Sequence, residues 1–377
     1  MLRPPYSQLC LLIVLVVSCV SPYEPPPINH GQQFLVVDAF LNTTDRSATV
    51  SLRYTTPLDS KEEPVYESSA VVTIRDEDDV QTLLTNHGNG TYGLSGIDVG
   101  NGKKYSLRIS TSTGGEYQSQ YIEAVQTPAI DSLSFLAGPD KIFINVNTHD
   151  PSGNSRYYRW FCTETFEYRT VYFSGLNIYD GVVTPKTADQ FIDKCWRTDL
   201  LHDINIRSTA SLNEDRVSNF TLRAIARGDI RISQKYSLFV QQQTLTEEAF
   251  QYWKSVKQTT ETLGGLFDPV PSQVIGNIQS VTNPDEPVIG FFSAGSVTQK
   301  RIFISRANLP RSYPTYNHDC VIDTIFLDAL PSVSNPHALL YPFYDGPSVI
   351  GYATTSTDCF DCRVLGGGTT TRPDFWE

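Results

Sequence analysis

The stretch from Tyr236 to Ile304 constrains the fold more than any other part of this sequence. It opens with a strand-like run, Tyr236–Val240, and continues with Thr244-Leu-Thr-Glu247, a capping box whose side chains satisfy free N–H groups at a helix start. Gly264-Gly265 marks the helix end, because glycine tolerates the left-handed backbone found there. One helix face is apolar at helical spacing, through Ala249, Tyr252, Trp253, Val256 and Leu263. We therefore expect a helix over residues 246–263 that buries this face.

Three strand-like runs follow the helix, at residues 274–281, 288–294 and 297–304. Asn283-Pro-Asp-Glu-Pro287 separates the first two runs and Gly295-Ser296 separates the last two, which is the residue chemistry of turns. Short connections favour neighbouring antiparallel strands. We therefore expect the helix to lie on an antiparallel meander formed by these three strands.

Strand-length runs rich in Val, Thr, Tyr and Phe recur about every ten residues between residues 33 and 127. Ala48–Tyr54 alternates apolar and polar positions, as a half-buried strand does, and Asn86-His-Gly-Asn-Gly90 is typical of a turn. Such a series predicts a β-sandwich of about seven strands. We expect this domain to be immunoglobulin-like or transthyretin-like and to end at Thr127-Pro128.

The remaining residues, 128–377, are expected to form a second β-rich domain that carries the helix, so the predicted fold class is mainly β. A length of 377 residues also favours two domains over one. Residues 156–171 form a long alternating aromatic stretch that includes Tyr158, Trp160 and Phe161. We expect at least half of these rings in the core, because alternate side chains of a strand point to opposite faces. The alternative is a sugar-stacking platform.

The charge balance excludes one large class of partners. Lys and Arg number 29 against 41 Asp and Glu, which gives a formal net charge of −12, and no segment forms a basic stripe or tail. Nucleic acids and anionic membrane surfaces attract basic proteins. We therefore expect no nucleic acid as a partner. The 19% of charged and 40% of hydrophobic residues are those of an ordinary globular protein.

The first residues predict export rather than a fold. Leu9–Val17 is apolar, and it is too short for a bilayer, which needs about 20 residues, but long enough for a signal-peptide core. It ends in Val16-Val17-Ser18-Cys19, which is typical of a bacterial lipobox, where the cysteine is lipidated. We expect a signal peptide at residues 1–18, lipidation of Cys19 and a Pro-rich tether at residues 19–32. The alternative is an ordinary signal peptide that ends in cysteine.

Five cysteines remain beyond the lipobox. Cys359-x-x-Cys362 lies in a glycine-rich terminal segment and not at a predicted helix start, so a redox pair is disfavoured. Structural disulfides are typical of exported β-rich proteins. We expect Cys320 to pair with either Cys359 or Cys362, Cys195 to pair with the other, and Cys162 to be buried. A four-cysteine zinc site would need a second close pair, which the sequence lacks.

No other pattern proposes a catalytic, cofactor or metal site. The histidines are scattered, with no pair at ligand spacing, and lie at His30, His87, His149, His202, His318 and His337. Asp76-Glu-Asp-Asp79 offers oxygen ligands for calcium but lacks the spacing of an EF-hand, so a solvated turn is expected. Gly366-Gly-Gly368 lacks the Lys of a phosphate loop, and no Gly-x-Ser-x-Gly elbow is present. We therefore expect a protein that is not an enzyme.

Four parts of the chain carry a resemblance to a known family. They are Cys19 with Pro22-Tyr23-Glu24-Pro25, the strand Asn154–Trp160, the helix and turn Leu245–Trp253 and Gly265–Gln273, and the ending Cys359–Trp376. In these parts the chain resembles the domain-of-unknown-function 4249 (DUF4249) family of Bacteroidota outer-membrane lipoproteins. The resemblance implies a partner of a TonB-dependent transporter. No activity is established for the family, so the resemblance assigns no catalytic residue.

The resulting hypothesis is a non-enzymatic accessory or ligand-capture subunit of a TonB-dependent transporter in nutrient uptake. Its lipid would hold it on the periplasmic or the cell-surface face of the outer membrane. The alternative is a free-standing cell-surface module for glycan or peptide binding or for adhesion. An exported hydrolase would need a cleft with a matched acid and base, and nothing in the residue spacing proposes one.

Overall fold

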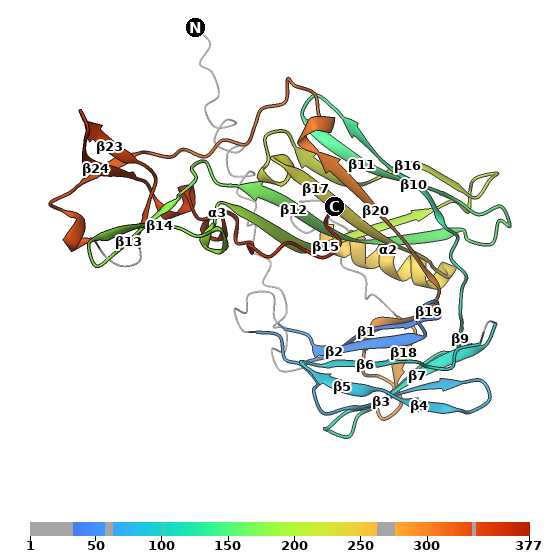
Figure 1. The fold of residues 1–377 in the computed structure, drawn as a ribbon. Helices are drawn as coiled ribbons and strands as arrows, with labels where there is room; N and C mark the ends of the chain where they lie inside the picture. The colour runs from blue at the N-terminus through green and yellow to red at the C-terminus, as the bar shows by residue number, and fades with distance from the viewer. Residues whose placement is uncertain (1–32, 57–62, 101, 262–275, 334–336) are drawn as a thin grey trace, which may run out of the picture.

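The computed structural model describes residues 33–56, 63–100, 102–261, 276–333 and 337–377. The predicted signal peptide, the predicted lipidation site Cys19 and the Pro-rich tether therefore lie outside the described residues, as does Gly264-Gly265. Within the described part, the predicted mainly β fold with one packed helix is confirmed (Figure 1). None of the described helices has the length and apolar character needed to cross a membrane.

Two facing sheets form the first β-sandwich, at the bottom of Figure 1. One sheet has the order β19 (Ile289–Gly295), β1 (Leu35–Asn42), β2 (Ser47–Tyr54), β6 (Thr91–Ser95) and β5 (Thr85–Gly88). The other has the order β18 (Ile278–Ser280), β8 (Glu116–Ser119), β7 (Lys104–Ser110), β3 (Val71–Asp76) and β4 (Gln81–Leu83), with β9 (Ile122–Glu123) beside β7. The predicted turn at 86–90 joins β5 to β6, where Asn89 and Gly90 adopt φ of 48° and 66°.

The chain returns to the first sandwich after the helix, so the expected antiparallel meander is wrong. β18 pairs antiparallel with β8, and β19 pairs parallel with β1. They complete the sheets of residues 33–127 with side chains such as Ile278 and Phe292, which are 4% and 0% exposed. Gly290 permits this pairing, because a Cβ there would lie 2.1 Å from a backbone oxygen of β1. The predicted second domain, 128–377, is therefore interrupted by a segment of the first sandwich.

The second β-sandwich lies above the first in Figure 1. Its larger sheet has the order β15 (Lys194–Ser208), β12 (Tyr157–Arg169), β17 (Lys235–Thr244) and β20 (Val297–Ser305). Its smaller sheet has the order β10 (Ile130–Ala137), β11 (Lys141–His149) and β16 (Arg216–Ala226). Only Ser296 separates β19 from β20, so the chain runs on from one sandwich into the other instead of turning back. The aromatic stretch forms β12. Tyr158 and Trp160 are buried, which confirms that alternate rings of this strand lie in the core.

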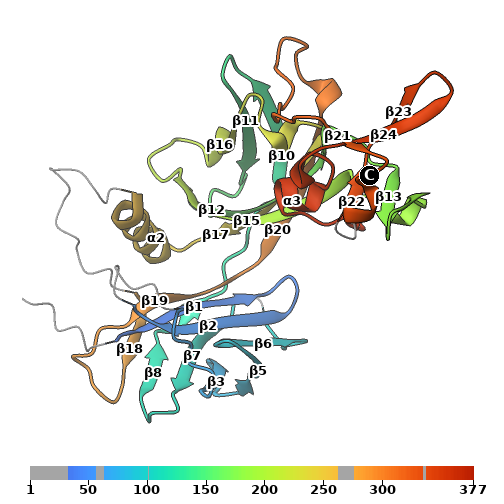
Figure 2. The same ribbon diagram turned by 90° about the vertical axis from the view of Figure 1, so that its left-hand side faces the viewer.

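The helix α2 (Glu247–Glu261) lies between the two sandwiches (Figure 2). Ala249 and Tyr252 on its apolar face are buried, and Trp253 is half-buried. Thr246 caps the helix, because its Oγ1 accepts a hydrogen bond from the Ala249 N–H at 3.2 Å. The capping box predicted from Thr244 is wrong, because β17 continues through that residue.

The described residues of 170–193 and 314–361 form a lobe that projects from the second sandwich, on the left of Figure 1. One of its small sheets has the order β14 (Val182–Pro185), β13 (Leu176–Tyr179) and β22 (His337–Leu339). The other has the order β21 (Asp323–Phe326), β24 (Ser348–Thr354) and β23 (Pro342–Asp345). The short helices are α3 (Cys362–Gly366), η1 (Ala188–Gln190), η2 (Ile230–Ile232), η3 (Arg306–Asn308), η4 (Leu330–Ser332) and η5 (Thr357–Cys359).

Two disulfides fasten the lobe and the C-terminal segment. Cys320 is bonded to Cys359 within the lobe, and Cys195 of β15 is bonded to Cys362 of α3. This is one of the two pairings that the sequence left open, and Cys162 is buried without a disulfide. The two cysteines of the Cys-x-x-Cys motif therefore bond to different partners, which makes both of them structural.

Candidate functional site

A cavity of about 180 Å³ lies where the two sandwiches and α2 meet. Its wall comes from three strands of the first sandwich, two strands of the second and the helix. The lining side chains are those of Asp38, Ala39, Phe40, Thr49, Ser51, Arg159, Phe161, Gln243, Trp253, Phe291 and Ser293. We call this cavity the Arg159 pocket.

Side chains alternate between the two faces of each strand, and this alternation explains both walls of the pocket. On β1, alternate residues such as Val37 and Leu41 enter the core of the first sandwich, so Asp38 points the other way. On β12, Trp160 enters the core of the second sandwich, so Arg159 points away from it, toward the helix and the first sandwich. The pocket therefore lies between the outer faces of two sheets whose inner faces are ordinary apolar cores.

The Arg159 guanidinium lies between two aromatic rings. Its central carbon is 3.3 Å from the ring centroid of Trp253 and 4.2 Å from that of Phe161. Cations over aromatic faces are attracted by the ring quadrupole. Among the described residues, no hydrogen bond or ion pair holds the guanidinium nitrogens. The rings thus fix the position of the charge and leave its hydrogen-bond donors available.

Burial lowers the pKa of Arg159 to about 10, while the nearby Asp38 carboxylate and Tyr252 oppose that change. Burial likewise raises the pKa of Tyr252 to about 12, so this phenol is neutral at pH 7. Arg159 therefore stays cationic at neutral pH, in a partly desolvated setting where its attraction for an anion is strengthened. Among the described residues, Asp38 and Arg159 are the only ionisable side chains that line the pocket.

This arrangement can bind an anionic group and position it. A guanidinium presents donors in a planar fork that matches a carboxylate or a phosphate. Its aromatic walls, Trp253, Phe161 and Phe291, suit an apolar portion of the same ligand. This combination of a cation and aromatic walls suits the recognition of an anionic group that carries an apolar portion.

A second buried charge cluster lies inside the second sandwich, and its groups are paired with one another. Glu164 accepts hydrogen bonds from Arg223 at 2.9 and 3.1 Å and from the Tyr236 hydroxyl at 2.9 Å. Arg231 lies 3.4 Å from Glu164 and is paired with Asp229 at 2.7 Å. Burial first, then the Glu164 charge, raises the pKa of Tyr236 far above its ordinary value. This cluster is saturated internally and holds the sandwich together.

The buried Cys162 beside that cluster is not an activated nucleophile. Burial raises the pKa of its thiol to about 12, so almost no thiolate exists at neutral pH. The thiolate is the reactive form of cysteine, and a raised pKa removes it. Cys162 therefore behaves as a small apolar core residue, as the sequence predicted for its burial.

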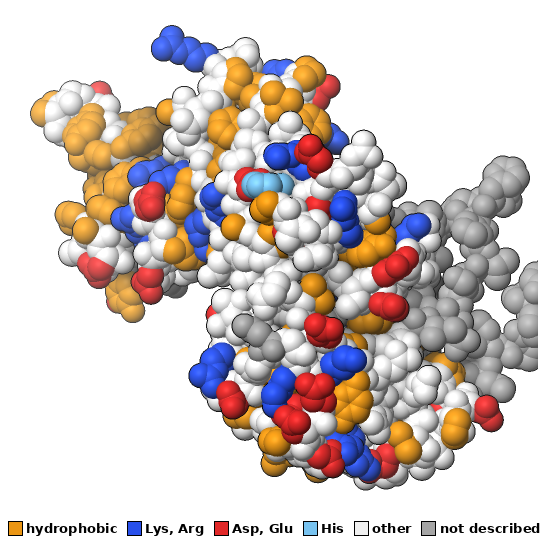
Figure 3. Space-filling model, turned by 90° about the vertical axis from the view of Figure 1, so that its right-hand side faces the viewer, with side chains coloured by type: hydrophobic (Ala, Val, Ile, Leu, Met, Phe, Trp, Pro, Cys, Tyr) orange, Lys and Arg blue, Asp and Glu red, His pale blue; other side chains and the backbone are white. Residues whose placement is uncertain are grey.

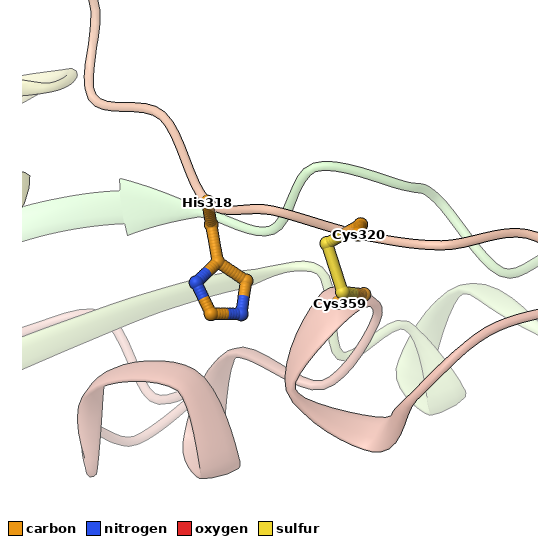
Figure 4. Close-up of side chains that lie close together, drawn as sticks. All are labelled: His318, Cys320 and Cys359. Carbon is orange, nitrogen blue, oxygen red and sulfur yellow. A yellow bond between two sulfur atoms is a disulfide. The ribbon is translucent and has the colours of Figure 1, made fainter.

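His318, Cys320 and Cys359 lie close together in the lobe, which would suit a metal ion by position alone (Figure 4). The two sulfur atoms are joined as a disulfide, so neither offers the thiolate that binds zinc. His318 instead lies 2.8 Å from a carboxylate oxygen of Asp358. Hydrogen bonds from Ser356 and His318 lower the pKa of Asp358, as expected for an ion-paired carboxylate. The disulfide and the contact between His318 and Asp358 therefore stabilise the lobe.

The other residues singled out from the sequence lie apart from the pocket. Asp76 and Asp78 of the acidic turn are paired with Lys103 at 3.3 and 2.6 Å, as a solvated turn would be. His149 is paired with Asp131 at 2.8 Å. The side chains of His87 and His202 do not line the pocket. His30 and the side chain of His337 lie outside the described residues.

Sequence reasoning missed Arg159, although a signal was present. Arg159 is the one charged residue in the run from Tyr157 to Phe161, and it stands on the face opposite the core rings. Trp253 was assigned to the helix core, and its contact with Arg159 depends on how the helix sits between the sandwiches. A charged side chain between four aromatic residues was the available signal.

The sequence matches, over residues 20–301, the family model described as Domain of unknown function (DUF4249). No curated protein matches the chain. The match begins within the predicted tether and includes both faces of the Arg159 pocket and the helix.

Three solved structures are weakly similar in fold. A cytokine receptor complex has 9% identity, covers 55% of this chain and 84% of its own, and has a TM-score of 0.20. A segment of two fibronectin type III domains from chicken tenascin has 11% identity, coverage of 57% and 94%, and a TM-score of 0.16. A pullulanase complexed with maltotriose, from Anoxybacillus sp. LM18-11, has 13% identity, coverage of 55% and 24%, and a TM-score of 0.15. Likeness at these scores carries no argument about this chain.

Proposed function

Because the chain belongs to the DUF4249 family, we propose that it is a Bacteroidota outer-membrane lipoprotein that captures a ligand for a TonB-dependent transporter without catalysing a reaction. A lipid on Cys19 would anchor it, and residues 19–32 would act as the tether. The lipobox and the family resemblance support the location and the partner. The Arg159 pocket supports ligand capture, because it holds a cation whose donors no described residue occupies.

The pocket also suggests what part of a ligand is captured. A charge-assisted hydrogen bond contributes about 1.5–3 kcal/mol. Losing one such bond would weaken binding by about 10- to 150-fold, at about 1.4 kcal/mol for each tenfold. A carboxylate or phosphate attached to an apolar body would use the guanidinium and the aromatic wall together. A neutral sugar would use the rings alone.

Calorimetry on the purified protein tests ligand capture. The probes are a hydrophobic tripeptide with a free carboxylate, the same tripeptide amidated at its C-terminus, and inorganic phosphate. We expect an anionic probe to bind and Arg159→Gln to weaken it by at least tenfold. Arg216→Gln is the matched control, because Arg216 is exposed on β16 and, within the described part of the chain, forms an ion pair with Glu214 alone. Equal binding by Arg159→Gln and wild type, or binding of no anion, would refute capture at this pocket.

The native host tests the location and the partner. We expect Cys19→Ala to leave the membrane fraction, and the tagged wild-type protein to bring a β-barrel transporter out of mildly solubilised outer membranes. Equal membrane retention of Cys19→Ala would end the anchoring proposal. Recovery of no barrel, together with a glycan or peptide in the Arg159 pocket, would favour the free-standing binding module.

A further inference from the structure

The lobe exposes more large apolar side chains for its length than the rest of the described chain does. It contributes 69 of the 321 described residues, yet it holds 12 of their 24 exposed large apolar side chains. The most exposed are Phe173, Tyr179, Val182, Val321, Phe326 and Tyr344, each more than half exposed. Figure 3 shows apolar side chains gathered on this lobe at the upper left of the view. A gathering of exposed apolar side chains of this kind is typical of an interaction site.

The same lobe is strongly acidic. Its residues, 170–193 and 314–361, include nine Asp and a single cation, Lys186, with no Glu or Arg, so its formal charge is −8 out of −12 for the chain. Asp323, Asp328 and Asp345 are exposed, and no cation lies within ion-pair distance of them among the described residues. Each of these carboxylates follows an exposed apolar residue in the chain, namely Ile322, Leu327 and Tyr344.

Two hairpins of the lobe repeat one pattern at their ends. The β13–β14 turn reads Tyr179-Asp-Gly181, and the β23–β24 turn reads Tyr344-Asp-Gly346. Both tyrosines are exposed, at 62% and 61%. Tyrosine supplies a large contact area at low conformational-entropy cost, which is why binding loops favour it. Each hairpin therefore presents an aromatic ring next to a carboxylate.

The lobe is a firm support for these side chains. Ile178, Leu330 and Leu339 form one small core, and Leu340, Ala353 and Phe360 form another. The Cys320–Cys359 disulfide closes the lobe, and Cys195–Cys362 fastens the adjoining α3 to β15. Because the scaffold is fixed before binding, less ordering entropy is lost when a partner docks. The exposed rings are not needed for these cores.

We propose that the lobe docks on a partner protein whose contact surface has an apolar centre bordered by Lys and Arg. The negative charge of the lobe distinguishes among three possible partners, which are a second copy of the lobe, an anionic lipid surface and a protein with a basic rim. A second copy of this lobe carries the same formal charge of −8, so the two copies would repel each other. An anionic lipid surface would repel the lobe for the same reason. A cationic rim would instead meet Asp323, Asp328 and Asp345. This inference deepens the proposed function by naming the surface that meets its partner, and it holds for any partner of this chemistry.

Site-specific photo-crosslinking of the full chain in its native host tests the proposal. A benzoylphenylalanine replaces Tyr344 at the hairpin end, and in the control it replaces Leu136, which is 62% exposed on β10 of the second sandwich. We expect the first position to give at least tenfold more of one protein adduct. Mass spectrometry is expected to place the crosslink in an apolar segment of the partner flanked by Lys or Arg.

Charge reversal supplies the second arm. We expect Asp345→Lys to reduce the adduct at least tenfold and raised salt to reduce it further, while the circular-dichroism melting curve stays unchanged because Asp345 is exposed. An adduct with a second copy, an adduct with lipid alone, or equal adducts from both positions would overturn the docking proposal. A non-transporter adduct that meets the chemical criteria would support docking and refute the transporter part of the proposed function.

Discussion

Single residues show how differently this chain treats its buried charges. Glu164 is 2% exposed and is surrounded by Arg223, Arg231 and the Tyr236 hydroxyl. Arg159 is held between rings, with no described carboxylate in contact. A buried charge paired with opposite charges is explained by the structure alone, whereas the Arg159 guanidinium has ring contacts but no hydrogen-bond partner among the described residues. That contrast is why Arg159, and not Glu164, is the candidate ligand group.

Replacing Glu164 tests its structural role. Glu164→Gln would leave Arg223 facing a neutral amide, and breaking a buried pair in this way costs about 3 kcal/mol. Urea unfolding followed by tryptophan fluorescence measures the loss. The control is Glu214→Gln, because Glu214 is exposed and its pair with Arg216 contributes less than about 1 kcal/mol. Equal stability of the two variants would show that the cluster is not needed for the fold.

At the scale of elements, the sequence indicated most strands and the helix but not their partners. The alternation in β1 and β12 says that one face is buried, and the same pattern is compatible with any neighbour. The run that forms β19 was assigned to the wrong neighbours, because it pairs with β1, and Val36 and its partner Ile289 lie far apart in the sequence. The Arg159 pocket needs that pairing, since Phe291 and Ser293 of β19 line it. The Arg159 pocket could therefore not be predicted from local sequence patterns.

The two disulfides, whose pairing the sequence left open, close loops of different length and predict a difference in stability. Cys195–Cys362 spans 167 residues and Cys320–Cys359 spans 39. In the chain-entropy model, the longer loop stabilises more, by about 1 kcal/mol, with a typical total of about 2–4 kcal/mol. We expect the Cys195→Ser/Cys362→Ser variant to unfold at lower urea than the Cys320→Ser/Cys359→Ser variant. The reverse order would show that the lobe disulfide contributes beyond its own loop.

At the scale of the whole molecule, the two sandwiches are not consecutive units of the chain. The chain leaves the first sandwich near Val125, builds most of the second, and returns for β18 and β19 before continuing into β20. Buried Asn277 fixes the return, with hydrogen bonds of 2.8 and 2.9 Å to the backbone of Phe292. The pocket lies where these crossings hold the two outer faces together, so its geometry depends on both sandwiches.

This connectivity predicts that residues 33–127 do not fold alone. Without β18 and β19 the core loses Ile278, Phe292 and Ala294, and both β1 and β8 become open sheet edges. The control fuses residues 276–296 after residue 127 through about 12 Gly and Ser residues, which span up to about 40 Å when extended. Residue 277 lies beside residue 120, where the Gln120 N–H donates to the Asn277 carbonyl at 2.9 Å. The seven residues from 120 to 127 span at most about 25 Å, so the linker is long enough. We expect dispersed amide resonances and a cooperative thermal transition for the fusion only. The same spectrum and transition from residues 33–127 alone would mean that the returning strands are additions to a complete domain, and the pocket would then lie on an accessory face.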